Sequence, residues 1–140
     1  FRNGDLGNAV HQAETVKSIR LILGVDDLQP GHGLKLVPRL PDSWESIAAE
    51  RHPIALGNGK TTWARLRYAR IEDGYRMEFE TTEPVRAASL RLGPFPAGTE
   101  RTTRTSFGKV TLRTIAGRVF AYVTPTDATR TKWNVTLRAR

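Results

Sequence analysis

Residues 34–44 read Leu34-Lys35-Leu36-Val37-Pro38-Arg39-Leu40-Pro41-Asp42-Ser43-Trp44, and the character of the chain changes across this stretch. Its first three residues alternate apolar, polar and apolar, which is the period-two pattern of a half-buried strand. Pro38 and Pro41 then end that strand, because each lacks a backbone donor and biases its predecessor toward extended geometry. Trp44 follows and is expected to be a large apolar anchor. The pattern before this stretch is helical and the pattern after it is that of β-strands.

A helix is predicted before this stretch. Asn8 can cap a helix that begins at Ala9, and Gly24 suits its C-cap. The apolar residues with helical spacing cover a broad arc: Ala9, Val10, Ala13, Val16, Ile19 and Leu21 to Leu23. Such a helix needs burial on more than one side, which a single neighbouring sheet does not easily supply. We therefore expect residues 1–33 to be the end of a helical domain or an interface helix. Asp26 and Asp27 open the turn-rich connection that follows.

Residues 34–140 are predicted to form an antiparallel β-sandwich of about eight short strands, because alternating segments recur between turn signals. The predicted strands after the first cover residues 44–49, 61–71, 76–80, 85–92, 109–113, 118–124 and 132–138. Pro53 follows the first of these, Asp73-Gly74 is a hairpin signal, and Glu83-Pro84 is expected to end a strand. Residues 93–108 are expected to be a long loop. The fold class is thus mainly β, with one N-terminal helix.

Composition excludes several classes of protein. The 140 residues are 39% hydrophobic and 26% charged, which is typical of one globular domain. No apolar run approaches the ~20 residues of a membrane span, and no leader-like segment is present. We expect a soluble protein without a membrane partner, either cytoplasmic or secreted. The chain has no cysteine, so it has neither disulfides nor thiolate metal sites.

The net charge of +8 raises the question of an acidic partner. The arginines are spread along the predicted strands in alternation with apolar residues, as on the solvated face of a sheet. One alternative is a free-standing basic β-domain that binds polyanions, either nucleic acid or an acidic polysaccharide. Glu78, Glu80 and Glu83 interrupt the basic surface, which disfavours this polyanion-binding alternative.

No complete active site is visible in the sequence. His11, His32 and His52 are too far apart in the chain to form a close pair of metal ligands, so we expect no metal and no cofactor. Glu14, on the apolar helix, is a weak candidate for a catalytic carboxylate. Trp63 falls on the predicted outer face with the arginines, where it could stack on a sugar ring. The candidate carbohydrate-binding residues are Trp63, Arg101 and Arg104.

The segments Gln12-Ala13-Glu14-Thr15, Leu21-Ile22-Leu23-Gly24-Val25 and 34–41, followed by Trp44, carry a resemblance. This part of the chain resembles the C-terminal end of bacterial carbohydrate-active enzymes built on an (α/α)6 barrel, such as glycoside hydrolases and disaccharide phosphorylases. In those enzymes the last barrel helix leads into a Leu-x-Leu-x-Pro-x-Leu-Pro-x-x-Trp-like segment and a small β-sandwich. The motif covers residues ~9–44, and the remainder is similar in strand pattern.

The resemblance implies that the catalytic carboxylates belong to the barrel, since no stretch here matches the barrel's catalytic motifs. The expected function is a non-catalytic accessory region that is structural and sometimes shapes the substrate cleft. The expected partners are the helical catalytic domain of the parent enzyme and a carbohydrate. A third hypothesis makes the chain an enzyme by itself, with Glu14 and an aspartate as acid and base.

Overall fold

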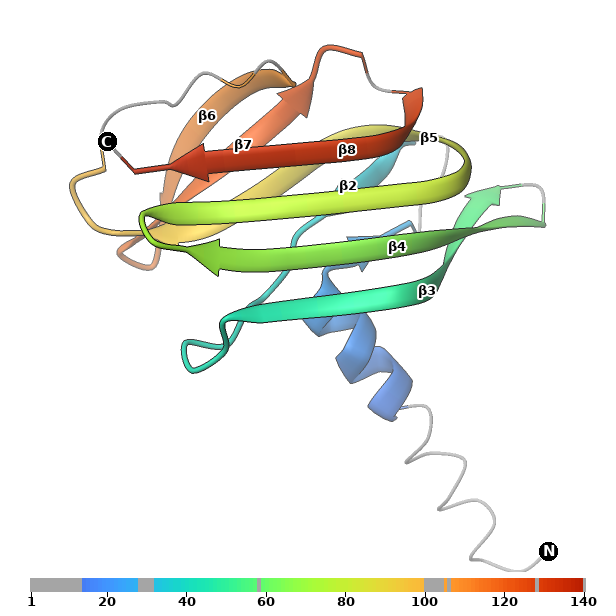
Figure 1. Ribbon diagram of the computed structural model, residues 1–140, viewed down its shortest axis with the longest axis horizontal. Helices are drawn as coiled ribbons and strands as arrows, with labels where there is room; N and C mark the ends of the chain where they lie inside the picture. The colour runs from blue at the N-terminus through green and yellow to red at the C-terminus, as the bar shows by residue number, and fades with distance from the viewer. Residues whose placement is uncertain are drawn as a thin grey trace, which may run out of the picture.

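The computed structural model describes residues 14–27, 32–57, 59–99, 105, 107–127 and 129–139. Within these ranges the chain forms one helix, residues 14–23, and eight strands (Figure 1). The strands are β1 (Val25–Asp26), β2 (Leu34–Leu36), β3 (Ser46–Gly57), β4 (Lys60–Ile71), β5 (Gly74–Phe95), β6 (Gly108–Ile115), β7 (Arg118–Pro125) and β8 (Thr129–Arg138). The predicted fold class, a mainly-β sandwich with one N-terminal helix, is confirmed.

The long strand β5 belongs to both layers of the sandwich. Its first half pairs with β4 and β8, and β3 lies beyond β4; we call this layer the front sheet (Figure 1). Its second half pairs with β2 and β7, with β1 and β6 outside them, and forms the back sheet. Seven strand pairs are found in the described residues, and one of them, β2 with β5, is parallel. Alternation of side chains does not reveal strand direction, so sequence alone predicted antiparallel pairing throughout.

Two prolines lie inside strands that we expected them to end, and that expectation was wrong. Pro84 falls within β5, where the pairing with β8 jumps from Glu80 to Val85. The missing donor costs little there because β5 is exchanging its front-sheet partners for its back-sheet partners. Pro53 lies in β3, which pairs with β4 alone among the described strands. An edge strand tolerates proline because one row of its backbone donors faces solvent.

The core lies between the two sheets. Its fully buried side chains include Tyr68, Phe79, Leu90 and Trp133, and the expected burial of Trp133 is confirmed at 2% exposure. The Tyr68 hydroxyl on β4 donates to the carbonyl oxygen of Gly93 at 3.1 Å and accepts from the Gly93 N–H at 2.9 Å. Gly93 belongs to the back-sheet half of β5, so this pair of hydrogen bonds joins the layers.

Trp44 does not anchor the core. Its side chain is 46% exposed, and its N–H donates to the carbonyl oxygen of Pro41 at 3.0 Å. The tryptophan therefore sits on a surface turn before β3. The expectation of a buried anchor was wrong because residues 41–44 reverse direction before the strand begins.

The helix is attached to the sandwich at its C-terminal end. Gly24 has φ +68°, as expected of a C-cap, and its carbonyl oxygen accepts from Val37 at 2.7 Å. A Cβ at Gly24 would lie 2.0 Å from the Val37 backbone, so glycine is required there on two grounds. The preceding Leu23 is buried at 5% exposure. The other turns extend away from the sheets (Figure 1).

The helix exposes several large apolar side chains. Val16, Ile19 and Leu21 are 57%, 50% and 57% exposed. Within the described part of the helix, the sandwich thus leaves these three apolar side chains largely uncovered, as the breadth of the apolar arc led us to expect. That a helical domain covers these side chains stays a prediction. The division of the chain at residue 33 into a helical part and a β-sandwich also stays a prediction.

Candidate functional site

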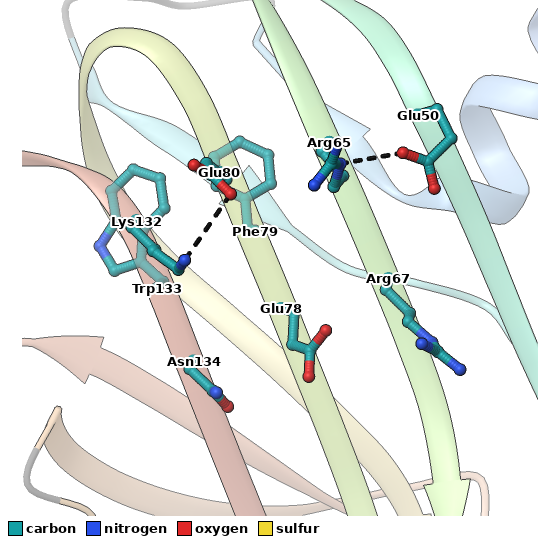
Figure 2. A pocket seen from close by; sticks show the side chains of 9 residues that line it. All are labelled: Glu50, Arg65, Arg67, Glu78, Phe79, Glu80, Lys132, Trp133 and Asn134. Atoms are coloured by element: carbon teal, nitrogen blue, oxygen red, sulfur yellow. Dashed lines mark ion pairs between the residues drawn. The ribbon is translucent and has the colours of Figure 1, made fainter.

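The outer face of the front sheet holds a pocket of about 530 Å³ (Figure 2). We call it the sheet-face pocket. Strands β3, β4, β5 and β8 each contribute side chains, which are charged or amide-bearing where they face outward. Its lining residues are Glu50, Arg65, Arg67, Glu78, Phe79, Glu80, Lys132, Trp133 and Asn134. Strand alternation places Phe79 and Trp133 beneath this surface, in the core.

One row of the pocket is internally neutralised. Arg65 is directly opposite Glu80 in the register, and Glu80 is opposite Lys132. Arg65 pairs with Glu50 at 2.9 Å and Lys132 with Glu80 at 3.8 Å, as the dashed lines of Figure 2 show. All four side chains are about half or more exposed, so each pair contributes at most about 1 kcal/mol. The charged side chains of this row are therefore paired with one another.

The adjacent row is free to bind. Arg67, Glu78 and Asn134 are opposite one another on β4, β5 and β8. Within the described part of the chain, their side chains make no ion pair or hydrogen bond, and Figure 2 shows them side by side. A guanidinium, a carboxylate and an amide together offer both donors and acceptors to a ligand. The pocket therefore suits a neutral, hydroxyl-rich molecule.

Trp63 is exposed on the same face of β4, as predicted. Its side chain is 41% exposed, and the Arg51 guanidinium lies 4.3 Å from the ring centroid. Four residues separate Trp63 from Arg67 along the strand, or ~13 Å at ~3.3 Å per residue. That distance is on the scale of a short oligosaccharide. A ligand of that length would reach both the sheet-face pocket and the indole of Trp63, with a different sugar unit at each.

The other predicted site residues are Arg101, Arg104 and Glu14. Arg101 and Arg104 lie outside the residues that the structure describes. Glu14 is on the helix, with its side chain 61% exposed and 2.8 Å from Lys17. A solvent-exposed carboxylate paired with its neighbouring lysine is typical of a helix surface. Its catalytic role stays an untested prediction.

A buried charged cluster lies at the C-terminal end of the helix, and the sequence analysis did not predict it. Asp27 is 6% exposed, forms an ion pair with Arg20, and accepts from the Ala55 N–H at 2.6 Å. His52 is also buried, and its Nε2 has no hydrogen-bond partner among the described residues. Burial and then the Arg20 charge lower the pKa of His52, while Asp27 acts in the opposite direction. The cluster fastens the helix and β1 to β3, and we assign it to stability.

Among the residues that the structure describes, no group of three or more His, Cys, Asp or Glu side chains is placed to hold a metal ion. His11 lies outside these residues. The described helix is too short to cross a membrane.

Comparison of the chain with protein-family models, with curated proteins and with solved structures found no match. The resemblance to the C-terminal region of (α/α)6-barrel enzymes therefore remains a prediction from the motif of residues ~9–44.

Proposed function

We propose that this chain is a non-catalytic accessory region of a carbohydrate-active enzyme, a glycoside hydrolase or a disaccharide phosphorylase. The observation that carries the proposal is the free row of Arg67, Glu78 and Asn134 beside the exposed Trp63. Carbohydrate recognition combines polar groups that hydrogen-bond vicinal hydroxyls with an aromatic surface for the sugar ring. The front sheet presents both on one face: the polar row lies in the sheet-face pocket of about 530 Å³, and Trp63 lies outside its lining, with Arg51 over one side of its ring.

The arrangement of carboxylates supports a binding role. Glycoside hydrolysis needs two carboxyl groups in different environments, one of them held as an acid by an apolar enclosure. In the pocket, the side chains of Glu50 and Glu80 are 77% and 49% exposed and each is paired with a cation. Glu78 is on an open sheet face between Arg67 and Asn134. The pocket supplies contacts to hydroxyl groups without an enclosed acid.

The helix supplies the proposed attachment to a helical catalytic domain. Val16, Ile19 and Leu21 are each at least 50% exposed, although an apolar helix face is normally buried in a globular protein. The charged cluster of Arg20 and Asp27 fixes the root of this helix to the sandwich. A helix held at one end and apolar on its free turns is suited to packing among the helices of a barrel.

The saccharide contact is tested by isothermal titration of the chain with neutral oligosaccharides, including maltose, cellobiose and xylotriose. We expect millimolar binding of at least one, weakened about tenfold by Glu78→Gln or Trp63→Ala, which corresponds to about 1.4 kcal/mol. Glu83→Gln removes the same charge from the neighbouring bend of β5, outside the pocket lining, and serves as the matched control. If none of these sugars binds, or if the control loses as much affinity as Glu78→Gln, the proposed contact is wrong.

The attachment is tested separately with Ile19→Lys. Because Ile19 is half exposed, we expect the stability of the isolated chain to change by less than about 0.5 kcal/mol. Association with a helical barrel domain of the proposed enzyme class, measured by co-purification and light scattering, should be lost. An isolated chain that unfolds on this substitution would show that the helix packs within the domain instead.

A further inference from the structure

The outer face of the back sheet carries a second cluster, in which arginines lie over aromatic rings. Phe120 and Tyr122 project from the same face of β7, and β7 lies between β5 and β6. The Arg91 guanidinium on β5 is 4.8 Å from the centroid of the Phe120 ring. The Arg113 guanidinium on β6 is 5.0 Å from the centroid of the Tyr122 ring. Two strands thus place their arginines across two rings on the central strand.

This face differs from the front sheet in its charge. Among the back-sheet strands, β2, β6, β7 and residues 85–95 of β5 contain no aspartate or glutamate. The one carboxylate of this sheet is Asp26, on the edge strand β1, where it lies opposite Lys35 and two strands away from β5. Within the described part of the chain, Arg91, Arg113 and Lys109 make no ion pair, and Arg118 reaches Asp42 at 3.5 Å from the end of β7. The chain's carboxylates therefore interrupt the positive charge of the front sheet and leave this face of the back sheet positive.

Stacking prepares the arginines for an anion. A guanidinium that lies on a ring keeps its orientation, and its N–H groups at the edge remain free to bind a carboxylate or sulfate in bidentate fashion. Arg91 and Arg113 come from strands two positions apart, so their backbones are separated by ~10 Å at ~4.8 Å per strand. A polymer with repeated anionic groups can therefore bind both arginines at once.

We propose that this face, formed by Arg91, Arg113, Lys109, Phe120 and Tyr122, binds an acidic polysaccharide. Phe120 and Tyr122 are only half-exposed, unlike Trp63, and each lies under a guanidinium group, so bases could stack on them only by displacing the arginines. An acidic glycan instead uses the arginines where they lie. The exposed hydroxyls of Thr111 and Thr124, directly opposite Tyr122 and Lys109, are available for its neutral hydroxyl groups. This site is on the other sheet from the sheet-face pocket and does not depend on it.

The site is tested by titrating the chain, by fluorescence anisotropy, with labelled polygalacturonate, dextran sulfate, uncharged dextran and a 30-nucleotide oligothymidylate. We expect binding of polygalacturonate and dextran sulfate at 20 mM NaCl, about tenfold or more weaker at 300 mM NaCl because salt screens the contact. Uncharged dextran should not bind at this face. The variant Arg91→Gln/Arg113→Gln should lose about tenfold or more in affinity for both acidic glycans.

Arg76→Gln/Arg138→Gln is the matched control, since it removes two arginine charges from the outer face of the front sheet, outside the sheet-face pocket. It should lose less than about threefold in affinity. Arg113→Lys keeps the charge but loses the planar stacked fork, and should be weakened about three- to tenfold. This variant also tests the site if the double variant fails to fold.

Equal losses in the two double variants would overturn the proposal in favour of diffuse attraction by the net charge. Tighter binding of oligothymidylate than of either glycan, through the same arginines, would replace the glycan with nucleic acid. No binding of either acidic glycan at 20 mM NaCl would also refute the site. None of these outcomes bears on neutral-sugar binding at the sheet-face pocket, so the two proposals fail independently.

Discussion

Replacing Tyr68 by Phe should cost this domain much more stability than its single lost oxygen suggests. The hydroxyl makes two hydrogen bonds to the backbone of Gly93, at 3.1 and 2.9 Å, in a part of the core where Tyr68 is 0% exposed. Phenylalanine fits the same space but leaves a buried N–H and a buried C=O without partners. At about 1–2 kcal/mol for each unsatisfied group, the expected loss is about 2–4 kcal/mol.

Tyr75→Phe is the matched control for this prediction. Tyr75 stacks on Tyr68 with ring centroids 5.4 Å apart, and its hydroxyl makes one hydrogen bond, to the carbonyl oxygen of Pro94 at 2.9 Å. Pro94 is only half-buried, so water can replace the lost donor, and we expect a loss of about 0.5–1.5 kcal/mol. Urea unfolding monitored by tryptophan fluorescence measures both variants.

The same tyrosine predicts an alkaline limit to stability. Burial raises the pKa of the Tyr68 hydroxyl above its ordinary value of 10.0, so the folded state favours the neutral group. Its contribution is therefore fully present below about pH 10 and is lost as the pH rises further. Tyr68→Phe should flatten the fall in stability between pH 9.5 and 11. A loss in Tyr68→Phe no larger than in Tyr75→Phe would refute the reasoning.

Two further predictions concern the root of the helix. Burial and the Arg20 charge lower the pKa of His52 in the fold, so protonation favours the unfolded state. Stability should therefore be full above about pH 6.5 and fall below it, and His52→Asn should reduce this dependence in urea unfolding at pH 5 to 8. Gly24→Ala meets both a positive φ and the Val37 backbone at 2.0 Å, and should cost about 2–4 kcal/mol in thermal unfolding. Gly117→Ala shares the positive φ, at +73°, without any atom within 4 Å, and should cost only about 1–2 kcal/mol. Equal losses of stability in Gly24→Ala and Gly117→Ala would show that the Val37 backbone can move away from the added methyl group.

The fold was predictable where one local pattern determined it. Alternation of apolar and polar residues placed Trp63 outward and Trp133 inward, and the glycine after the apolar helix marked its end at Gly24. The extension of β5 through Pro84 was not predictable. It depends on a change of pairing partners, which the sequence around the proline does not reveal.

The candidate sites depend on contacts between distant strands. Arg67, Glu78 and Asn134 are 11 and 56 residues apart along the chain, and only the pairing of β4, β5 and β8 makes them neighbours. Asp27 was interpreted as a turn residue because it follows Asp26, yet packing against β3 buries it. Likewise, the sequence shows a basic chain interrupted by glutamates, and only the sandwich separates those glutamates from the arginine–aromatic face of the back sheet.

The central claim is that the row of Arg67, Glu78 and Asn134 on the front sheet contacts a saccharide. The most direct measurement is a titration of the 15N-labelled chain with the best-binding neutral oligosaccharide, followed by amide and side-chain NMR shifts. We predict that the Asn134 side-chain amide, the Arg67 Nε–H and the Trp63 indole N–H shift together with one dissociation constant. Shifts confined to other surfaces, with these three signals unmoved at saturation, would contradict the account.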